Sequence, residues 1–391
     1  MTALITNAPP GLGSWSPAGE LPWAHSHFGA AGTATPLADG RVLVAGGGNA
    51  ALTARAEAAL FDPRTGAWSV TGSLIEGRRI HSTVRLADGT VLVAGGQRGP
   101  VSSPLQALAS AELYDPATGV WSQTGAMGQA RYGHSATLLT DGRVLVAGGH
   151  YVRSPRSNGA LHSAELYDPG TRTWTPTGPM TDARYSHPAI PLPDGQVLVV
   201  GGYVPFTHGY GAGLAHCELY QPTTGQWVPA GTMSTPRHSH RATLLADGTV
   251  LVSGGGDPGA AADGGRFNPY SRATTERYDP VADTWTPDTP MPTGRTHHRA
   301  VLLPSGRVLV AGGTNDVTLL TGYGNAALYD PYTRAWSWAP GMAIPRWDFA
   351  ATALADGRVL VAGGAVRTGA TAPLPGDDVL TTSAEIYTPS P

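Results

Sequence analysis

Histidine and arginine recur together in this chain at a fixed spacing that could support binding or catalysis. Five histidines each follow an arginine by three residues, and a sixth arginine is followed at the same distance by a phenylalanine. The arginines are Arg78, Arg131, Arg184, Arg237, Arg295 and Arg346, and the histidines are His81, His134, His187, His240 and His298. Converging imidazoles could hold a transition metal, and guanidinium groups could hold a carboxylate or phosphate. The regular spacing equally allows a structural role, in which these side chains hydrogen-bond neighbouring units together.

The positions where this pattern breaks are the most informative. Near the N-terminus, counting back from the following Asp-Gly places Gly29 and Gly32 at the arginine and histidine positions, and His25 and His27 lie just upstream. In an extended segment both histidines share one side, and His-x-His is a familiar metal-binding spacing. Two interpretations stay open, a metal site and a solvated loop. A second His-x-His that includes His240 makes the signal less distinctive.

The other breaks lie towards the C-terminus. One unit carries the doublet His297-His298, and in the next unit Trp347 and Asp348 stand between the arginine and the phenylalanine. We predict that His25, His27 and His297 bind a divalent transition metal (copper, zinc or iron), with Asp348 and His298 as catalytic residues. The predicted substrate-binding residues are the six arginines together with Tyr132, Tyr185, Trp347 and His150.

A repeat must position these residues. The pattern Asp-Gly-Arg-Val-Leu-Val-Ala-Gly-Gly recurs with small changes, beginning at Asp39, Asp88, Asp141, Asp194, Asp247, Ser305 and Asp356. In the third repeat, residues 131–139 read as an inner strand, 143–147 as a buried second strand, 163–167 as a third strand ended by Pro169, and 173–175 as an outer strand. Repeats of roughly 50 residues with a Gly-Gly and regularly spaced aromatic residues are typical of a β-propeller.

From residue 14 to residue 388 the chain resembles the kelch-repeat family, and more narrowly a stand-alone bacterial kelch protein. The resemblance implies an all-β, seven-bladed kelch propeller with four-stranded antiparallel blades. Its known members include galactose-oxidase-like copper enzymes, sialic acid mutarotases, iron-dependent nitrile-specifier proteins and ubiquitin-ligase adaptors that bind peptides. Galactose-oxidase-like chemistry needs a Tyr–Cys crosslink and a metal histidine from a separate C-terminal domain, which we do not expect here. Cys217 reads instead as a small buried core residue.

Ring closure is also predicted. The last repeat stops after Tyr387 without an outer strand, and the segment around Trp15 resembles that missing strand. We therefore expect residues 14–391 to form one propeller domain closed by its N-terminal strand, preceded by an extension at residues 1–13. The Arg-x-x-His segments and the insertions after Gly-Gly should emerge on one face, which we predict to carry the site.

Composition narrows the classes of function. The chain has 25 basic and 28 acidic residues, so its net charge of −3 argues against nucleic acid or an anionic membrane as partner. Every basic residue is arginine, which suits a GC-rich bacterial genome and rules out lysine-based catalysis. The sequence contains no phosphate-binding loop motif, so we expect no nucleotide cofactor. No apolar run is long enough to span a membrane and no signal segment is recognisable, so we expect a cytoplasmic protein.

Two functions are compatible with these observations. The first is a metal-dependent enzyme that acts on a small anionic or aromatic substrate in a His- and Arg-rich pocket over the central channel. The second is a module without catalysis that binds an acidic peptide or partner protein on the same face. Recurrent glutamates two residues before the third-strand aromatic position are predicted to be structural hydrogen-bonding residues, and they are Glu112, Glu165, Glu218, Glu276 and Glu385.

Overall fold

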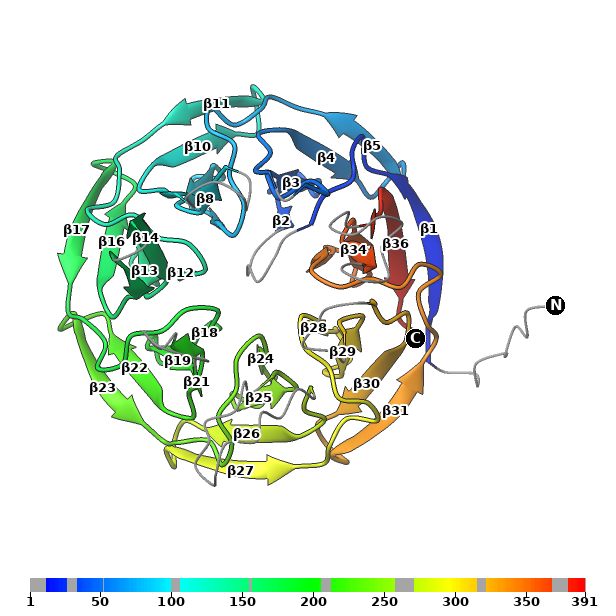
Figure 1. The fold of residues 1–391 in the computed structure, drawn as a ribbon. Helices are drawn as coiled ribbons and strands as arrows, with labels where there is room; N and C mark the ends of the chain where they lie inside the picture. Colours follow the sequence, from blue (N-terminus) through cyan, green and yellow to red (C-terminus); the bar gives the residue numbers. More distant parts are fainter. Residues whose placement is uncertain are drawn as a thin grey trace.

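The computed structural model shows seven four-stranded antiparallel sheets arranged as blades around a central channel (Figure 1). It describes residues 12–26, 34–51, 53–99, 106–154, 157–204, 212–256, 271–314, 321–367 and 379–390. The predicted seven-bladed β-propeller is confirmed.

The blades follow the repeats, and each is listed from its innermost strand outwards. Blade 1 contains β2 (Thr35–Pro36), β3 (Val42–Ala45), β4 (Ala58–Asp62) and β5 (Ala67–Val70); blade 2 contains β6 (Ser82–Arg85), β7 (Val91–Ala94), β10 (Ala111–Asp115) and β11 (Val120–Gln123). Blade 3 contains β12 (Ser135–Leu138), β13 (Val144–Ala147), β16 (Ala164–Asp168) and β17 (Thr173–Thr177); blade 4 contains β18 (Ala189–Pro191), β19 (Val197–Val200), β22 (Cys217–Gln221) and β23 (Gln226–Ala230). Blade 5 contains β24 (Arg241–Leu244), β25 (Val250–Ser253), β26 (Thr275–Asp279) and β27 (Thr284–Asp288); blade 6 contains β28 (Arg299–Leu302), β29 (Val308–Ala311), β30 (Ala326–Asp330) and β31 (Ala335–Ala339). Blade 7 contains β32 (Ala350–Ala353), β33 (Val359–Ala362), β36 (Ser383–Thr388) and β1 (Ser14–Glu20).

The second strand of each blade is buried on both faces, which explains its continuous apolar sequence. In blade 3, Val144 and Val146 of β13 pack with Leu92 and Ala94 of β7 in blade 2. The core therefore lies between adjacent blades, and each blade needs its neighbours to bury its apolar side chains. The Asp-Gly turn before this strand needs a glycine, since Gly142 has a φ of 87°.

Aromatic residues join the outer strands of adjacent blades. Tyr114 and Trp121 pair across β10 and β11 with ring centroids 4.9 Å apart. The Trp121 indole donates a hydrogen bond of 2.7 Å to the carbonyl of Gly72 in blade 1, and Trp174 donates one of 2.7 Å to Gly125 in blade 2. These regularly placed rings pack the blades together.

The chain termini close the ring as predicted. β1 pairs with β36, with Trp15 opposite Tyr387. The Trp15 indole donates to Pro340 of blade 6 at 2.7 Å, and the Trp68 indole of blade 1 donates to Ala18 of β1 at 2.9 Å. The N-terminal strand therefore contacts blades on both sides. No helix with the length and apolar character of a membrane span occurs among the described residues.

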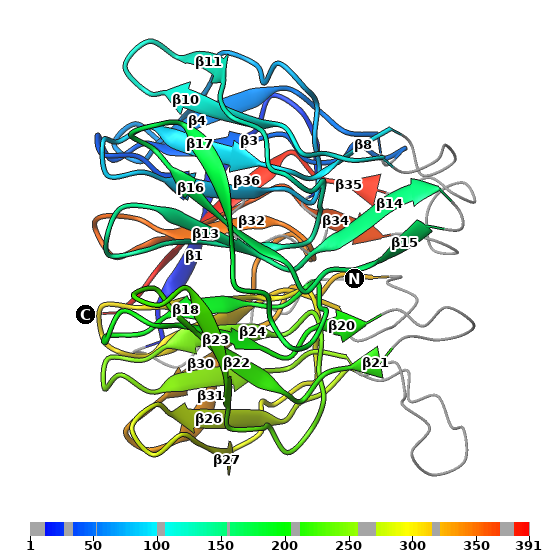
Figure 2. The same cartoon turned by 90° about the vertical axis from the view of Figure 1, so that its left-hand side faces the viewer.

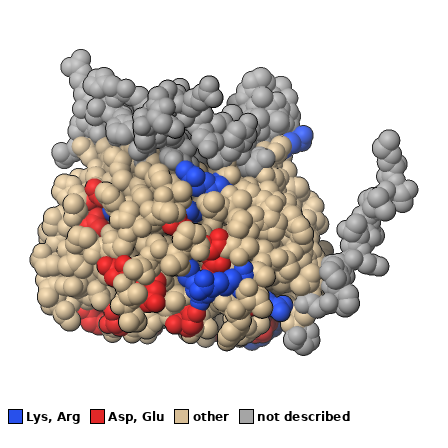
Figure 3. All heavy atoms as spheres, turned by 90° about the horizontal axis from the view of Figure 1, so that it is seen from below, with Lys and Arg blue, Asp and Glu red and all other residues tan. Residues whose placement is uncertain are grey.

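The two faces of the disc differ. In the described part of the chain, four two-stranded hairpins project from one face, which we call the hairpin face (Figure 2). They are β8 (Gln97–Arg98) with β9 (Gln106–Ala107), β14 (His150–Ser154) with β15 (Ser157–Ala160), β20 (Tyr203–Val204) with β21 (Ala212–Gly213), and β34 (Ala365–Arg367) with β35 (Val379–Leu380). The opposite face, which we call the turn face, carries the Asp-Gly and Asp-Pro turns. On the outer wall in Figure 3, acidic and basic side chains lie side by side instead of forming a field of one sign.

Candidate functional site

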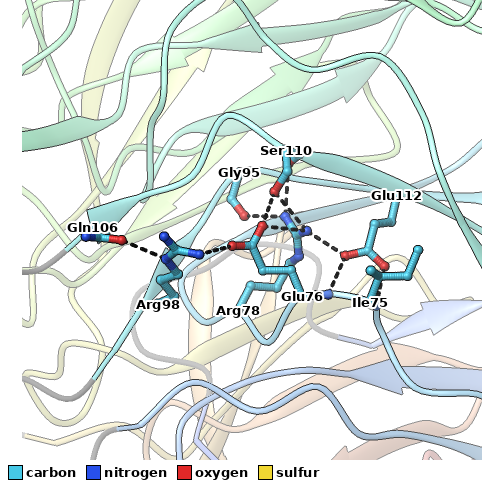
Figure 4. Close-up of polar contacts among 8 residues, drawn as sticks. All are labelled: Ile75, Glu76, Arg78, Gly95, Arg98, Gln106, Ser110 and Glu112. Atoms are coloured by element: carbon cyan, nitrogen blue, oxygen red, sulfur yellow. Dashed lines mark hydrogen bonds and ion pairs between the residues drawn. The ribbon is translucent and has the colours of Figure 1, made fainter.

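The arginines of the Arg-x-x-His segments lie inside the blades. All six side chains are 0% exposed. Figure 4 shows Arg78, which donates to the carbonyls of Gly95 at 2.8 Å and Ser110 at 3.0 Å and to the Glu112 carboxylate at 2.7 Å. Glu112 also accepts the backbone N–H groups of Ile75 and Glu76, so both its oxygens are bound.

The same ion pair recurs around the ring, and we call it the arginine–glutamate layer. Its other members are Arg131–Glu165, Arg184–Glu218, Arg237–Glu276 and Arg346–Glu385, with N–O distances of 2.7 to 2.8 Å. In blade 6, Arg295 pairs instead with the Asn325 side chain at 2.8 Å, and burial lowers the pKa of Arg295 to about 10. This geometry favours a structural role over substrate binding for all six arginines. It also confirms the predicted structural role of the glutamates.

The histidines of these segments are likewise buried between blades. Nε2 of His134 contacts the Ser82 hydroxyl at 2.9 Å, and Nε2 of His187 contacts that of Ser135 at 3.1 Å. His298, predicted to be catalytic, is 0% exposed and contacts the Ser253 hydroxyl at 3.0 Å. Burial, and then the charge of Arg241, holds the pKa of His298 well below its usual value. Its position again favours a structural role.

His25 occupies the position in blade 1 that corresponds to the ring arginine of the other blades, a position that counting along the sequence assigned to Gly29. Its carbonyl accepts the N–H of Gly364 at 2.9 Å, as the carbonyl of Arg131 accepts that of Gly96 at 2.9 Å. His25, and not Gly29, therefore stands at the arginine position of the ring. The segment between His25 and β2 is longer than its counterpart between Arg131 and β12, so counting back from the Asp-Gly turn selected the wrong residue.

The described residues do not fit the predicted metal site. His25 is 0% exposed, burial lowers its pKa to about 4, and its Nδ1 lies 3.4 Å from the carbonyl of Trp23. In the described part of the chain, no three His, Cys, Asp or Glu side chains converge as a metal ion would require. The third predicted ligand, His27, lies outside the described residues, as does Gly32.

Of the residues predicted to form one site, His297 and Asp348 do contact each other. Nδ1 of His297 lies 2.9 Å from Oδ1 of Asp348, which joins blade 6 to blade 7. Both residues have positive φ, 54° and 49°. Such a conformation is costly for a residue other than glycine and clusters at functional sites. Trp347, predicted to bind substrate, is buried and meets the His297 ring edge-on at 5.7 Å.

This strained conformation recurs around the channel. The residue two positions after the arginine has positive φ in six blades, and these residues are Ile80, Gly133, Ser186, Ser239, His297 and Asp348. Backbone hydrogen bonds connect several of them from blade to blade, such as Gly133 to Ile80 at 3.0 Å and Ser186 to Gly133 at 2.8 Å. The backbone is constant here, and the side chains differ.

Two channel arginines, Arg241 and Arg299, were missed by sequence reasoning. They begin β24 and β28, and their Nε atoms donate to the carbonyls of His298 at 2.7 Å and Phe349 at 2.6 Å. Burial lowers the pKa of Arg241 in blade 5, and the charge of Asp348 in blade 7 opposes this shift. Because these two blades are not adjacent, we infer that both side chains approach the central channel. Ser82 and Ser135 occupy the same position in blades 2 and 3. The replacement of this serine by arginine in blades 5 and 6 is the sequence feature that could have identified the two residues.

We call His297, Asp348, Arg241 and Arg299 the channel cluster. Burial lowers the pKa of Arg299 well below its usual value, and the charge of Arg241 lowers it further. Two guanidinium groups and one carboxylate leave the cluster with an excess of positive charge. The cluster can therefore attract an anionic group.

Aromatic rings form a continuous arc on the hairpin face beside the channel. Successive ring centroids are 5.1, 5.1, 5.1 and 5.3 Å apart along Tyr132, His150, Tyr185, Tyr203 and His238. Backbone bridges pair Tyr132 with His150 and Tyr185 with Tyr203. This aromatic arc brings together three of the predicted substrate-binding residues, and all five of its side chains are partly exposed.

Burial keeps the two histidines of the arc uncharged near neutral pH. It raises the pKa of Tyr132 to about 12 and lowers the pKa of His150 to about 4 and that of His238 to about 3. The arc therefore offers flat apolar surfaces with polar edges, and its last member, His238, lies near His297 of the channel cluster. Such rings provide contact area at a small cost in conformational entropy.

Comparison with known proteins agrees with the fold. The family model described as "KLHDC2/KLHL20/DRC7 Kelch-repeats domain" matches residues 32–255. Kelch-like protein 34 of Homo sapiens is 27% identical over 219 residues, which is 55% of this chain and 31% of that protein. Kelch-like protein terF of Aspergillus terreus is 24% identical over 66% of this chain and 55% of that protein. The chain thus spans about a third of the length of Kelch-like protein 34.

Among solved structures, a fungal alcohol oxidase of the AA5 family in complex with copper superposes with a TM-score of 0.72. The match covers 97% of this chain and 76% of the oxidase at 20% sequence identity. At that identity the likeness extends to the fold alone.

Proposed function

The chain belongs to the kelch-repeat family, and we propose that it is a binding module whose hairpin face holds a peptide segment of a partner protein at the mouth of the channel. Peptide binding is among the activities that the kelch resemblance implies. The observation that carries the proposal is the aromatic arc beside the channel cluster. The repeated charges, by contrast, are bound within the blades.

The site suggests the chemistry of the peptide. An apolar or aromatic side chain would lie against Tyr185 and Tyr203, whose rings are partly exposed. An acidic side chain would enter the channel towards Arg241 and Arg299, where guanidinium groups can form charge-assisted hydrogen bonds with a carboxylate. The preferred partner is therefore an acidic segment that also carries an aromatic residue.

The test is a fluorescence-anisotropy screen of labelled peptides that combine aromatic and acidic residues, using the full chain. We expect Tyr185→Ala and Arg241→Gln each to weaken the best peptide about tenfold or more, as at an interface hot spot. The control is Arg143→Gln, which removes an arginine of the turn face whose side chain is bound to Asp141 at 2.7 Å. Binding that responds to the Arg143 variant but not to the other two would move the interface to the turn face and refute the proposal.

A catalytic use of the channel is a second candidate, favoured by one contact. A carboxylate hydrogen-bonded to Nδ1, as Asp348 is to His297, orients an imidazole for proton transfer at its other nitrogen. We derive no step through copper, zinc or iron, because the described residues do not assemble a metal site. Turnover of a small ester or carboxylate that His297→Gln abolishes without weakening substrate binding would support the enzyme. Turnover unchanged in that variant would exclude this role for His297.

A further inference from the structure

A cavity on the turn face, away from the channel, lies where the ring closes between blades 6 and 7. Its volume is about 320 Å³, and its walls include Leu12, Leu303, Leu328, Arg307, Tyr332 and Ser390. We propose that this closure cavity binds a small aromatic monocarboxylate. The proposal is independent of peptide binding on the hairpin face.

The way in which the ring closes produces the cavity. In the other blades the third and outer strands are consecutive in sequence, and in blades 2 to 4 the third-strand tyrosine bonds to a threonine of the preceding blade, as Tyr167 does to Thr124 at 2.6 Å. In blade 7, β36 and β1 come from opposite ends of the chain, so no Asp-Pro turn covers Tyr387. Its hydroxyl donates instead to the carbonyl of Leu12, and the N–H of Gly13 donates to Ser390 at 2.6 Å. The two chain ends form one wall of the cavity.

Arg307 also departs from the repeat. In three blades the turn aspartate binds the arginine two residues later at 2.7 Å, and these pairs are Asp39–Arg41, Asp141–Arg143 and Asp356–Arg358. In blade 6, Ser305 replaces the aspartate. Among the described residues, the Arg307 side chain then has only a longer ion pair, 3.5 Å from Nε to Asp330, and it is 42% exposed.

A second contact of this arginine is missing as well. Arg41 and Arg358 each reach the carbonyl of a proline in the next blade, Pro116 at 3.1 Å and Pro63 at 3.0 Å. The Nη groups of Arg307 make no such hydrogen bond to the described residues. In Arg41 and Arg358 these guanidinium donors form hydrogen bonds within the protein. In Arg307 the same donors are directed towards the cavity.

The walls define the ligand. A carboxylate would bind Arg307 and the nearby hydroxyl of Ser390, and a flat apolar body would lie against Leu12, which is partly exposed. Tyr332, which is 89% exposed, can close over a ring from the rim. The lining combines apolar and aromatic side chains with four polar ones, Ser305, Arg307, Asp330 and Ser390, and a cavity of this mixed kind suits a small molecule that has both an apolar body and a charged group. Asp330, close to Arg307, disfavours a second negative charge, so a monocarboxylate fits better than a phosphate ester.

The test compares phenylacetate with its neutral analogue phenylacetamide by isothermal titration calorimetry on the full chain. We expect phenylacetate to bind about tenfold tighter or better, because a charge-assisted hydrogen bond distinguishes the two. Ser305→Asp should restore the turn carboxylate, engage Arg307 and remove this preference. The variant recreates the sequence of the other repeats, so its fold should persist. Asp141→Ser in blade 3 is the converse control and should leave binding unchanged.

Three outcomes would overturn the proposal: no binding of phenylacetate, equal binding of the two probes, or an unchanged preference in Ser305→Asp. Tyr185→Ala on the hairpin face should leave phenylacetate binding intact. Its effect on peptide binding is measured separately, so a failure of either site is distinguishable from a failure of the other.

Discussion

The arginine–glutamate layer and the residues that directly follow its arginines are adjacent in sequence but differ in their contacts and in how much they vary. Arg78 is fully buried and ion-paired within its blade, whereas Arg79, the next residue, forms a backbone bridge to Gln97 beside the hairpin. The first position is nearly constant from blade to blade. The second is occupied by Arg79, Tyr132, Tyr185, His238, Thr296 and Trp347.

The difference shows which conspicuous residues carry specificity. The arginine that recurs in most blades has the same structural role in each of them. Its guanidinium group donates hydrogen bonds to the carbonyls at the Gly-Gly and at the start of the third strand. A position whose residue changes from blade to blade has no structural role common to the blades, so its side chain is available to recognise a ligand. The varied positions of a propeller therefore deserve more weight than its regular ones when a site is sought.

Ring closure should have the largest effect, because the repeated layer requires every blade to have two neighbours. Deleting residues 1–20 removes β1 and with it both the Trp15 and the Trp68 contacts of blade 7. We expect loss of cooperative unfolding and aggregation through the exposed edge of β36, measured by calorimetry and light scattering. A monomeric deletion variant with unchanged melting would show that the ring does not depend on this strand.

Removing one buried arginine should come next. Arg131→Ala leaves Glu165 buried without its partner and should lower the free energy of unfolding by about 3–5 kcal/mol. Arg295→Ala should cost less, because its partner Asn325 is neutral. Chemical denaturation measures both. Equal losses, or a loss of peptide affinity without a loss of stability, would contradict the contrast between the two sets of residues.

Acid should destabilise the protein through the buried histidines. Burial lowers the pKa of His25 to about 4 and those of His81 and His187 to about 3, below the ordinary value of 6.5. The unfolded chain binds these protons first, so stability is full above pH 6.5 and falls as the pH drops towards 4. Each of these histidines should contribute about 1.4 kcal/mol per pH unit across that window.

Urea unfolding between pH 7 and pH 4 measures this slope. His187→Gln, which keeps a polar side chain near Ser135, should reduce the slope by the share of one histidine. A slope that is the same in this variant and in the parent chain would show that His187 already titrates normally in the folded protein.

The smallest effect is expected in the channel cluster. Asp348→Asn keeps the shape of the side chain but removes its charge, and should lower the free energy of unfolding by about 1–2 kcal/mol. An acidic peptide should bind a few-fold more tightly and with greater sensitivity to salt, since Arg241 and Arg299 lose their counter-charge. Anisotropy titrations at two salt concentrations measure this gain. A weaker peptide complex would indicate that Asp348 itself contacts the ligand.

Some of the site was predictable from sequence because a repeat supplies its own reference frame. The departures at His297 and Asp348 stood out against the regular units, and these residues do meet. The same frame misplaced the equivalent position in blade 1, where a longer segment before β2 put His25, and not Gly29, in the ring. Arg241 and Arg299 did not stand out in the sequence, because the residue at their position differs from repeat to repeat and follows no regular pattern.

The sequence alone determined the number of blades, the strand order within each, the closing strand and the face that carries the hairpins, because all four follow from local periodicity and from the phase at which the repeat begins and ends. Only the tertiary structure decided which charged side chains are ion-paired inside the blades and which remain available to a ligand. Whether an arginine is bound to a carboxylate inside its blade, as Arg131 is, or approaches the channel, as Arg241 does, depends on side-chain direction between blades that are distant in sequence. The same holds for the closure cavity, which exists because two chain ends meet where the other blades have a turn.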